Sequence, residues 1–344
     1  MRSYFKKTVS LLLSVIMLVL FCTGCSAKKE ENPSTDSTQK ELTKITLNEV
    51  AHSIFYAPQY VAIEEGYFKE VGIDLELVTG FGADKVMTAV ISGDADIGFA
   101  GSEASIYVYA EGSDDYAVNF AQLTQRAGNF LVAREPMDNF KWTDLKGRTI
   151  LGGRAGGMPQ MLLEYILKKN GLDPKTDLEI VQNIDFGSTA AAFSSGVGEF
   201  TAEFEPSATA LEAEGAGHVV ASLGVDSGYV PYTAYCAKQS FINENPELLQ
   251  AFTNAIQKGI DYVNSHTSEE IAKIIAPQFP ESDLATITKI VDRYKQQDTW
   301  KDDTIFEEES YDLLIDILKE SGELEKDVPY NDLVTTKFSK EAAK

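Results

Sequence analysis

The chain has 344 residues, 44% of them hydrophobic, and a formal net charge of −23 at neutral pH. Its length and hydrophobic content are enough for two domains, each with its own core. So large a negative charge repels nucleic acid and anionic lipid headgroups, which excludes nucleic acid as an expected partner.

The first 25 residues have the pattern of an export signal. Three cations precede an apolar run from Val9 to Phe21, which is too short for a permanent transmembrane helix. Residues 22–25 read Cys-Thr-Gly-Cys, with a small residue before the last cysteine. The segment resembles a bacterial lipoprotein signal, although Cys22 stands where such signals usually carry Leu. The resemblance implies that residues 1–24 are removed and that Cys25 is acylated.

An uncleaved N-terminal anchor is the alternative, and in both cases the folded part is held at the outer face of the cell membrane. Residues 25–43 contain almost nothing apolar, so we expect a flexible tether between the lipid bilayer and the folded part. With residues 1–24 removed and Cys25 acylated, Cys236 is the one remaining cysteine. No intramolecular disulfide is then possible, and we expect a monomer stabilised by its core.

From residue 44, strand-like and helix-like segments alternate with short turns that contain glycine, which favours parallel sheets covered by helices. The first set has strands at 45–50, 73–78, 97–100, 117–123 and 130–133, and helices at 58–69, 84–92 and 103–110. The second set has strands at 149–151, 178–182, 200–204 and 218–223, and helices at 159–170, 189–195 and 207–214. The two sets predict two α/β lobes, at residues 44–135 and 136–233.

The last part of the chain is helical in pattern. After a strand-like segment at 233–237, which we expect to be the return crossing between lobes, apolar residues recur at helical spacing. The predicted helices are 246–264, 268–276, 282–297 and 306–321. We expect residues 234–344 to pack back onto the first lobe and so to complete a two-lobed α/β body.

Six short motifs occur in an order that is typical of one family. They are Phe-Tyr-Ala-Pro at 55–58, Ala-Ile-Glu-Glu-Gly-Tyr-Phe-Lys at 62–69, Gly-Ile-Asp-Leu-Glu-Leu at 72–77, Ser-Gly-Asp-Ala-Asp-Ile-Gly at 92–98, Asp-Leu-Lys-Gly-Arg-Thr-Ile at 144–150 and Phe-Glu-Pro at 204–206. Over residues 44–334 the chain resembles the solute-binding proteins of ABC importers, in the branch that handles aliphatic sulfonates, taurine, nitrate and the pyrimidine precursor of thiamine.

This resemblance implies the type II periplasmic binding protein fold, in which two lobes grip a small nutrient and close by hinge bending. It also implies an ABC permease and its ATPase as partners. Open parallel sheets bind ligands at the carboxyl ends of their strands, so the loops after the predicted strands are candidate binding loops. The candidate ligand-binding residues are His52, Phe55, Tyr56, Phe81, Gly82, Asp84, Ser102, Glu103, Gln125, Arg126, Arg154, Gly156, Gly157, Met158, Glu203, Glu205, Tyr229 and Tyr232.

Two of these loops are rich in glycine. Residues 80–83 precede a helix and offer backbone N–H groups to an acceptor, or they simply form a tight turn. Residues 152–157 are not a nucleotide P-loop, since no Lys-Ser or Lys-Thr follows. Arg154 in this second loop either clamps an anion or is solvated beside it.

Three carboxylates, Glu103, Glu203 and Glu205, favour a nitrogen-rich or cationic ligand, unless they point to solvent. Aromatic side chains in or near the candidate loops offer faces for stacking or for a cation. They are Phe55, Tyr56, Phe81, Phe99, Phe204, Tyr229 and Tyr232. We therefore expect a pyrimidine or similar nitrogenous nutrient, with a sulfonate or another small anion as the alternative. On this interpretation Glu205→Gln weakens a basic ligand more than an anionic one.

Other classes of function have less support. The three histidines, His52, His218 and His266, lack metal-ligand spacing, so we expect no metal, no cofactor and no catalytic constellation. A related fungal fold makes the thiamine pyrimidine as an enzyme with a cysteine-rich motif, which this chain does not contain. A sensory or adhesive lipoprotein that delivers its ligand to no permease stays open, and neighbouring permease and ATPase genes would distinguish the two.

Overall fold

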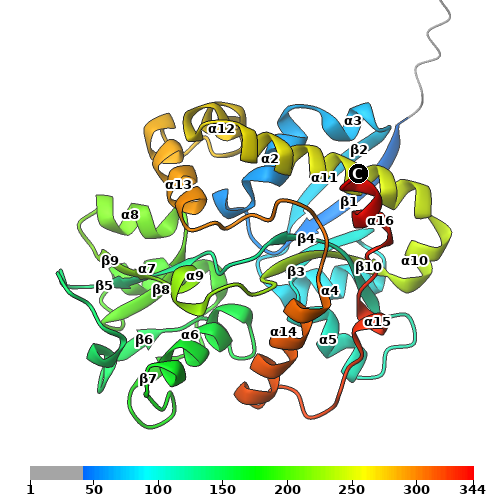
Figure 1. Cartoon of the computed structure of the whole chain (residues 1–344). Coiled ribbons are helices and arrows are strands. Elements are labelled where there is room, and N and C mark those ends of the chain that lie inside the picture. Colours follow the sequence, from blue (N-terminus) through cyan, green and yellow to red (C-terminus); the bar gives the residue numbers. More distant parts are fainter. Residues whose placement is uncertain (1–41) are drawn as a thin grey trace, which may run out of the picture. The chain divides into compact units, whose positions relative to one another are not determined.

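The computed structural model describes residues 42–344. The predicted signal peptide, the lipidation of Cys25 and all but the end of the tether lie outside the described residues. The described part contains two five-stranded sheets, each with helices around it (Figure 1). This is the predicted two-lobed α/β architecture, and the first strand begins at Thr43, the last residue of the predicted tether.

The sheet of the first lobe has the strand order β2–β1–β3–β10–β4. Its strands are β1 (Thr43–Glu49), β2 (Ile73–Thr79), β3 (Ile97–Gly101), β4 (Ala117–Thr124) and β10 (Thr233–Lys238). β1 pairs parallel with β2 and β3, whereas β10 pairs antiparallel with β3 and β4. The segment that we expected to be a return crossing is therefore a strand inside the first sheet, and the sheet is mixed rather than parallel.

The sheet of the second lobe repeats this plan in the order β7–β6–β8–β5–β9. Its strands are β5 (Asn129–Ala133), β6 (Thr149–Leu151), β7 (Glu179–Val181), β8 (Phe200–Phe204) and β9 (His218–Ser222). β5 pairs antiparallel with β8 and β9, so the strand assigned to the first lobe belongs to the second. The chain crosses between lobes at 125–128, not near 135, and returns at 228–232. Strand propensity predicted β5 itself but carries no information about which sheet it joins.

The helices around the sheets follow most of the predicted ranges. They are α2 (Ala57–Glu64), α3 (Tyr67–Glu70), α4 (Ala83–Ser92) and α5 (Glu103–Ala110) in the first lobe, and α6 (Met158–Lys169), α7 (Thr189–Ser194), α8 (Ser207–Ala213) and α9 (Leu223–Ser227) in the second. The predicted helix at 58–69 is broken because Gly66 has a φ of 76°, a left-handed conformation that glycine adopts readily.

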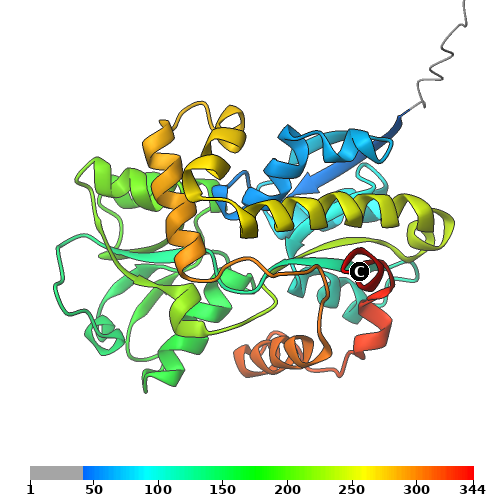
Figure 2. The same ribbon diagram turned by 45° about the horizontal axis from the view of Figure 1, so that its top comes forward.

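The C-terminal part consists of further helices (Figure 2). They are α10 (Gln239–Glu244), α11 (Pro246–Ser265), α12 (Ser268–Ile275), α13 (Leu284–Gln296), α14 (Glu308–Ser321), α15 (Tyr330–Leu333) and α16 (Lys337–Ala342). α11 packs on α2 and α16 in the first lobe. α13 contacts both lobes: its Tyr294 packs against Phe55 of the first lobe, and its Arg293 binds Glu205 of the second. α14 packs on α6 of the second lobe. The expectation that all these helices pack on the first lobe is thus incomplete for α13 and wrong for α14.

The long helix α11 shows why the C-terminal sequence folds in this way. Leu249, Phe252, Ile256, Ile260 and Val263 are spaced three or four residues apart, so they share one face of the helix, and all five are fully buried. Burial of a large aliphatic or aromatic side chain contributes about 1.5–3 kcal/mol. This apolar face fixes α11 on the first lobe.

Candidate functional site

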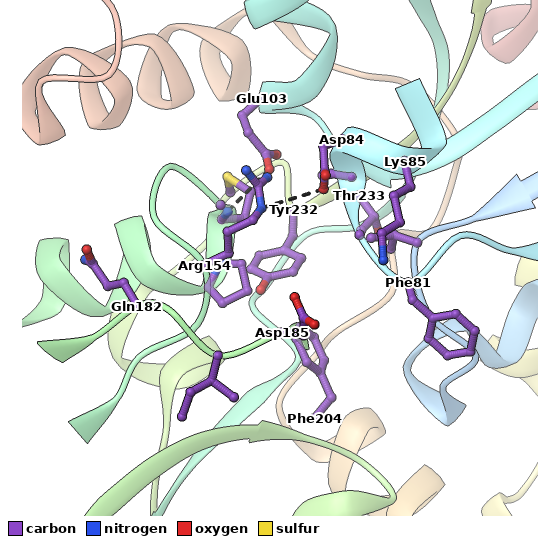
Figure 3. Close-up of a pocket in the computed structure, with 18 of the residues that line it drawn as sticks. Phe81, Asp84, Lys85, Glu103, Arg154, Gln182, Asp185, Phe204, Tyr232 and Thr233 are labelled. Carbon is purple, nitrogen blue, oxygen red and sulfur yellow. Dashed lines mark hydrogen bonds and ion pairs between the residues drawn. The ribbon is translucent and has the colours of Figure 1, made fainter. Parts of the chain in front are cut away.

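A cavity of about 240 Å³, here called cavity 1, lies between the two lobes (Figure 3). It is formed at the carboxyl ends of the strands, as predicted, by loops and helix starts of both lobes. Its lining residues are Val50, Tyr56, Phe81, Gly82, Ala83, Asp84, Lys85, Gly101, Glu103, Arg154, Gly157, Met158, Pro159, Gln182, Asn183, Ile184, Asp185, Phe204, Tyr232 and Thr233. Nine of the eighteen candidate residues are among them.

The walls of cavity 1 are largely aromatic, with Tyr56 and Phe81 from the first lobe, Phe204 from the second and Tyr232 from the return crossing. Phe81 has a φ of 55°, in the left-handed region that residues other than glycine seldom adopt, and it is 56% exposed. Such an outlier is typical of a functional site, and this one holds an aromatic face in the cleft.

The glycine-rich turn that carries Phe81 does not offer its glycine amides to a ligand. The N–H of Gly80 donates to the carbonyl of Glu49, and the N–H of Gly82 donates to the carbonyl of Val50. The tight-turn interpretation therefore describes these two residues, while their neighbour Asp84 lies in the first turn of α4 and lines the cavity.

Glu103 is a buried carboxyl that lines cavity 1 from the first turn of α5. Its Oε1 accepts a 3.3 Å hydrogen bond from the backbone N–H of Met158, which begins α6 in the other lobe. Its Oε2 is buried without a hydrogen-bond partner. Burial raises the pKa of Glu103 to about 7, although backbone N–H groups and Arg154 oppose the shift. The lobes therefore meet at a carboxyl that has one unused oxygen.

Arg154 and Asp84 form the second contact between the lobes at this cavity. Arg154 Nε lies 3.7 Å from an oxygen of Asp84, and the two side chains are 46% and 57% exposed (Figure 3). Lys85 and Asp185 also line the cavity, which thus has acidic groups in excess of basic ones. An anionic ligand would have to compete with Asp84 for the guanidinium.

The loop at 182–185 lines cavity 1 and was absent from the candidate residues. It follows β7, which holds the same place in the second sheet as β2 holds in the first, next to the central parallel strand. Since the loop after β2 was a candidate, the same rule applied to the second set would have found this loop.

A smaller cavity of about 170 Å³, here called cavity 2, adjoins cavity 1. Phe81, Pro159 and Phe204 line both. The other residues that line cavity 2 are Ala51, His52, Ser53, Asn129, Gly153, Gly187, Thr189, Ala190, Ala202, Glu203, Glu205, Pro206 and Ser207. It holds three further candidate residues, His52, Glu203 and Glu205.

Glu203 is a buried carboxyl of cavity 2 that is held by two hydroxyl groups. Thr201 Oγ1 donates to its Oε1 at 2.5 Å, and Thr189 Oγ1 donates to its Oε2 at 3.1 Å. Burial raises the pKa of Glu203 to about 7, although both hydroxyl groups oppose the shift. Near neutral pH this carboxyl is partly protonated, so it can both accept and donate a hydrogen bond.

Glu205 lines cavity 2, but its oxygens are already bound. Oε1 lies 2.5 Å from Arg293 Nη1 and accepts a hydrogen bond from Thr209 Oγ1, while Oε2 accepts one from the Thr209 N–H. Arg293 comes from α13, far away in the sequence. The side chain of Glu205 thus stabilises the contact between α13 and the second lobe, and we no longer expect it to bind a ligand.

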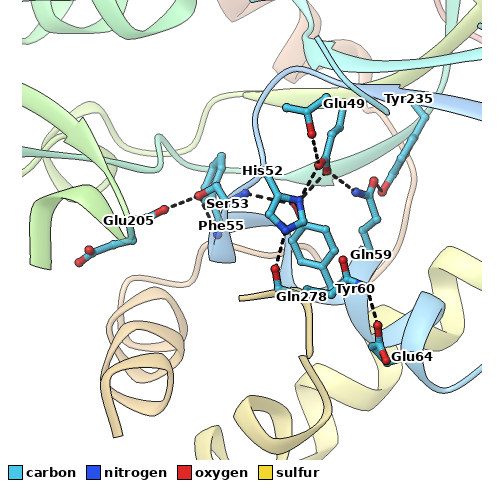
Figure 4. Close-up of polar contacts among 11 residues, drawn as sticks. Glu49, His52, Ser53, Phe55, Gln59, Tyr60, Glu64, Glu205, Tyr235 and Gln278 are labelled. Atoms are coloured by element: carbon cyan, nitrogen blue, oxygen red, sulfur yellow. Dashed lines mark hydrogen bonds and ion pairs between the residues drawn. The ribbon is translucent and has the colours of Figure 1, made fainter. Parts of the chain in front are cut away.

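His52 belongs to a hydrogen-bond network beside cavity 2 (Figure 4). Its Nδ1 lies 2.8 Å from Glu49 Oε1 and its Nε2 lies 2.8 Å from the carbonyl oxygen of Gln278. Both partners are acceptors, so both hydrogen bonds form when the ring carries both protons. Partial burial lowers the pKa of His52, but the hydrogen bonds to Glu49 and Gln278 outweigh it, and the pKa is raised. Both nitrogens are therefore engaged within the protein.

Six candidate residues line neither cavity. They are Phe55, Ser102, Gln125, Arg126, Gly156 and Tyr229. Phe55 is fully buried among aromatic rings, and Ser102 donates to the carbonyl of Pro231. Gln125, Arg126 and Tyr229 lie along the crossings, where Arg126 stacks 4.1 Å from the ring centroid of Tyr229. Gly156 accepts a hydrogen bond from Tyr107 of the first lobe.

These six residues and Phe99 were candidates because they lie in or near loops that follow predicted strands. Phe99 is likewise fully buried, with its ring stacked on that of Tyr235. A loop residue can point into the core or along the crossing as well as into the cleft, and the backbone pattern does not distinguish these directions. The structure thus places twelve of the eighteen candidate residues at the two cavities.

Within residues 42–344, no cluster of three His, Cys, Asp or Glu side chains is placed to hold a metal ion. In the same range no helix has the length and apolar content needed to cross a membrane. Cys236 is buried and free, and burial raises the pKa of its thiol to about 12, which makes it unreactive.

The fold and the two-lobed cleft define a solute-binding architecture, and comparison with known proteins gives the family. A family model described as "NMT1/THI5 like" matches residues 54–270, and the chain belongs to this family. YtlA of Bacillus subtilis, named as a candidate binding protein, is 47% identical over 301 residues, covering 88% of this chain and 90% of that protein.

More distant relatives have names that state a ligand or a reaction. A riboflavin-binding protein, RibY, of Chloroflexus aurantiacus is 26% identical over 71% of each chain. A formylaminopyrimidine-binding protein of Halalkalibacterium halodurans is 25% identical over 78% of each chain. A 4-amino-5-hydroxymethyl-2-methylpyrimidine phosphate synthase of Aspergillus parasiticus is 24% identical over 61% of this chain and 63% of that protein.

Solved structures share the fold. The nitrate-binding protein NrtA of Synechocystis PCC 6803 has a TM-score of 0.72 and 16% identity, over 88% of this chain and 89% of its own. The alkanesulfonate-binding protein SsuA of Xanthomonas axonopodis has a TM-score of 0.68 and 16% identity, over 86% of this chain and 99% of its own. These likenesses confirm the predicted periplasmic binding protein fold.

Proposed function

We propose that this protein is a lipid-anchored solute-binding protein of an ABC importer, which captures a small nitrogen heterocycle between its lobes and delivers it to a membrane permease. The proposal is supported by the family, by the fold and by the names of relatives that bind riboflavin and a formylaminopyrimidine. A thiamine-precursor pyrimidine is the favoured ligand.

The observation that carries the proposal is the free oxygen of Glu103 in a cavity with aromatic walls. A buried acceptor without a partner costs roughly 1–3 kcal/mol, and a ligand N–H removes that cost when it binds. With a pKa of about 7, Glu103 accepts from an exocyclic amine when ionised and donates to a ring nitrogen when protonated. Aromatic walls on either side suit a planar ring.

An anion is the second candidate ligand, because Arg154 and Lys85 line the same cavity. The acidic side chains of Asp84, Glu103 and Asp185 oppose it. An enzymatic role would need a reactive group, and Cys236 is buried with a raised pKa.

Binding is tested by calorimetric titration of the purified full chain with aminopyrimidines, thiamine, taurine, an alkanesulfonate and nitrate. We expect heat of binding with the aminopyrimidines and none with the anions. A ligand present at a hundredfold excess over its Kd also stabilises the folded state by about 2.7 kcal/mol, which a thermal shift detects. If only sulfonate or nitrate binds, the ligand is an anion and the proposal of a nitrogen heterocycle is wrong.

The anchor and the location at the outer face of the cell membrane rest on the sequence of residues 1–25. Cys25→Ser is expected to move the protein from the membrane fraction to the soluble fraction and to abolish incorporation of labelled palmitate. Unchanged fractionation of Cys25→Ser would contradict acylation and support the uncleaved anchor.

A further inference from the structure

Cavity 2 differs from cavity 1 in the chemistry of its walls. Apart from the shared Phe81 and Phe204, its lining includes small residues such as Ala51, Gly153 and Ala190, which leave room for a chain of atoms. Its aromatic lining residues are the shared pair and His52. The two cavities together form a cleft with a larger part that has aromatic walls and a smaller part that is lined by fewer aromatic side chains.

Asn129 gives cavity 2 a hydrogen-bond donor that the protein does not use. Asn129 is fully buried, and its Oδ1 accepts a 2.9 Å hydrogen bond from the hydroxyl group of Tyr232, which lines cavity 1. The amide Nδ2 of Asn129 takes no part in this bond and is buried without a hydrogen-bond partner. A buried donor without a partner carries a cost that a ligand oxygen would remove.

Glu203 supplies the complementary group in the same cavity. It is buried and is among the residues that line cavity 2, and its carboxyl is held in place by its two threonine partners. The cavity thus presents an amide donor in Asn129 and a carboxyl acceptor in Glu203. A hydroxyl group both donates and accepts, so a hydroxylated chain satisfies both side chains at once.

The same walls disfavour a phosphate group. Glu203 and Glu205 are both acidic, none of the residues that line cavity 2 is Lys or Arg, and the guanidinium of Arg293 is bound to Glu205 and Glu212. His52 has both ring nitrogens engaged by Glu49 and Gln278, so it offers no further donor. A doubly charged substituent would enter this space without a counter-ion.

We propose that the cleft takes a heterocycle that carries a hydroxylated, unphosphorylated substituent, with the ring in cavity 1 and the substituent in cavity 2 against Asn129 and Glu203. The inference rests on the proposed function, since it assumes that a nitrogen heterocycle occupies cavity 1. It adds that a bare ring fills only part of the site.

Two matched ligand series test the inference by calorimetric titration of the full chain. One series is cytosine, cytidine and cytidine monophosphate, and the other is lumichrome, riboflavin and flavin mononucleotide. In at least one series we expect the hydroxylated member to bind about tenfold or more tighter than the bare ring, from one or two additional hydrogen bonds. The phosphorylated member of that series is expected to bind no more tightly than the bare ring.

Variants locate the effect. Ala190→Leu fills cavity 2 from α7 and is expected to remove the tenfold preference while the bare ring binds as before. Glu203→Gln is expected to reduce the preference about threefold or more. Ala191→Leu on the same helix is the control, because Ala191 is exposed and lines neither cavity. Binding of the bare ring shows in each case that the variant is folded.

The outcomes separate the two proposals. Equal affinity for bare and hydroxylated rings, or a preference that survives both Ala190→Leu and Glu203→Gln, overturns the role of cavity 2 and leaves the proposed function intact. No binding by any member of either series, or of the aminopyrimidines, overturns the proposed function and this inference with it.

Discussion

Glu103 and Glu205 hold equivalent places in the two lobes but have different surroundings. Each follows the third strand of a parallel trio, β2–β1–β3 in one sheet and β7–β6–β8 in the other. Each is buried at the carboxyl end of its sheet. Glu103 keeps an oxygen without a partner, whereas both oxygens of Glu205 are bound by Arg293 and Thr209.

The difference comes from α13, which has no counterpart at the first lobe's cleft loop. Arg293 on this helix forms an ion pair with the carboxylate of Glu205, and this pair stabilises the contact between the C-terminal helices and the second lobe. At Glu103 the partner from the other lobe is a single backbone N–H of Met158. A carboxylate at a strand end is thus a ligand group only where the rest of the chain leaves it free.

The largest expected effect is the loss of stability in Glu205→Ala. The Glu205 side chain is fully buried and that of Arg293 is 23% exposed, so the substitution leaves a largely buried cation with Glu212 as its remaining acidic partner. Breaking a buried pair on one side costs about 3–5 kcal/mol, and we expect the lower end because Glu212 stays. Urea unfolding of the full chain measures this change.

A double-mutant cycle with Arg293→Met separates the pair from its surroundings. The double variant is expected to recover part of the lost free energy of unfolding, since no unpaired charge remains. If Glu205→Ala unfolds like the unmodified protein but binds heterocycles much more weakly, the original interpretation of Glu205 as a ligand group is restored.

The fold could be predicted from the sequence further than the site could. Alternation of strands and helices is a local pattern, and it located every strand of both sheets. The assignments that failed, β5 in the first lobe and β10 as a crossing, depend on which sheet a strand joins. At the site, Arg293 lies 88 residues from Glu205, and no local pattern pairs them. The glutamates could therefore be predicted as cleft residues but not sorted by role.

The next largest effect is a dependence of stability on pH that comes mainly from the two carboxyls whose pKa values are raised most, those of Glu103 and Glu203. The pKa values of Glu103 and Glu203 are about 7 in the folded protein, against 4.5 for the ordinary group. Between these values the folded state binds more protons than the unfolded state, so the free energy of unfolding falls as pH rises from about 4.5 to about 7. Each group contributes at most about 3 kcal/mol to this fall in the free energy of unfolding.

Urea unfolding across this range measures the slope in the unmodified protein and in Glu103→Gln and Glu203→Gln. Each variant is expected to reduce the slope of the free energy of unfolding against pH. Glu205→Gln keeps both Glu103 and Glu203 and is the contrasting variant, so the part of the slope that these two carboxyls cause is expected to remain. A slope that neither Glu103→Gln nor Glu203→Gln changes would mean that other groups titrate there.

A smaller effect is expected on ligand affinity in Glu103→Gln. The amide keeps the shape of the side chain but replaces a charge-assisted acceptor, so an aminopyrimidine should bind about 10- to 100-fold more weakly. The free energy of unfolding should change little or rise, because a buried carboxyl with an unused oxygen is removed. Glu164→Gln is the matched control, since Glu164 is buried on α6 and lines neither cavity. Equal losses in both variants would argue against contact between Glu103 and the ligand.

The smallest effect concerns the arginines that accompany the two glutamates. Arg154 is paired with Asp84 at 3.7 Å, and both side chains are about half exposed, so Arg154→Met is expected to cost less than about 1 kcal/mol in urea unfolding. Arg293→Met, which leaves Glu205 buried and unpaired, is expected to cost several times more. Comparable losses in the free energy of unfolding would mean that Arg154 stabilises the contact between the lobes as strongly as Arg293 stabilises the contact of α13. A small cost leaves Arg154 as a weak, exposed contact that can break when the lobes move apart, which is what a cleft that opens to admit a ligand requires.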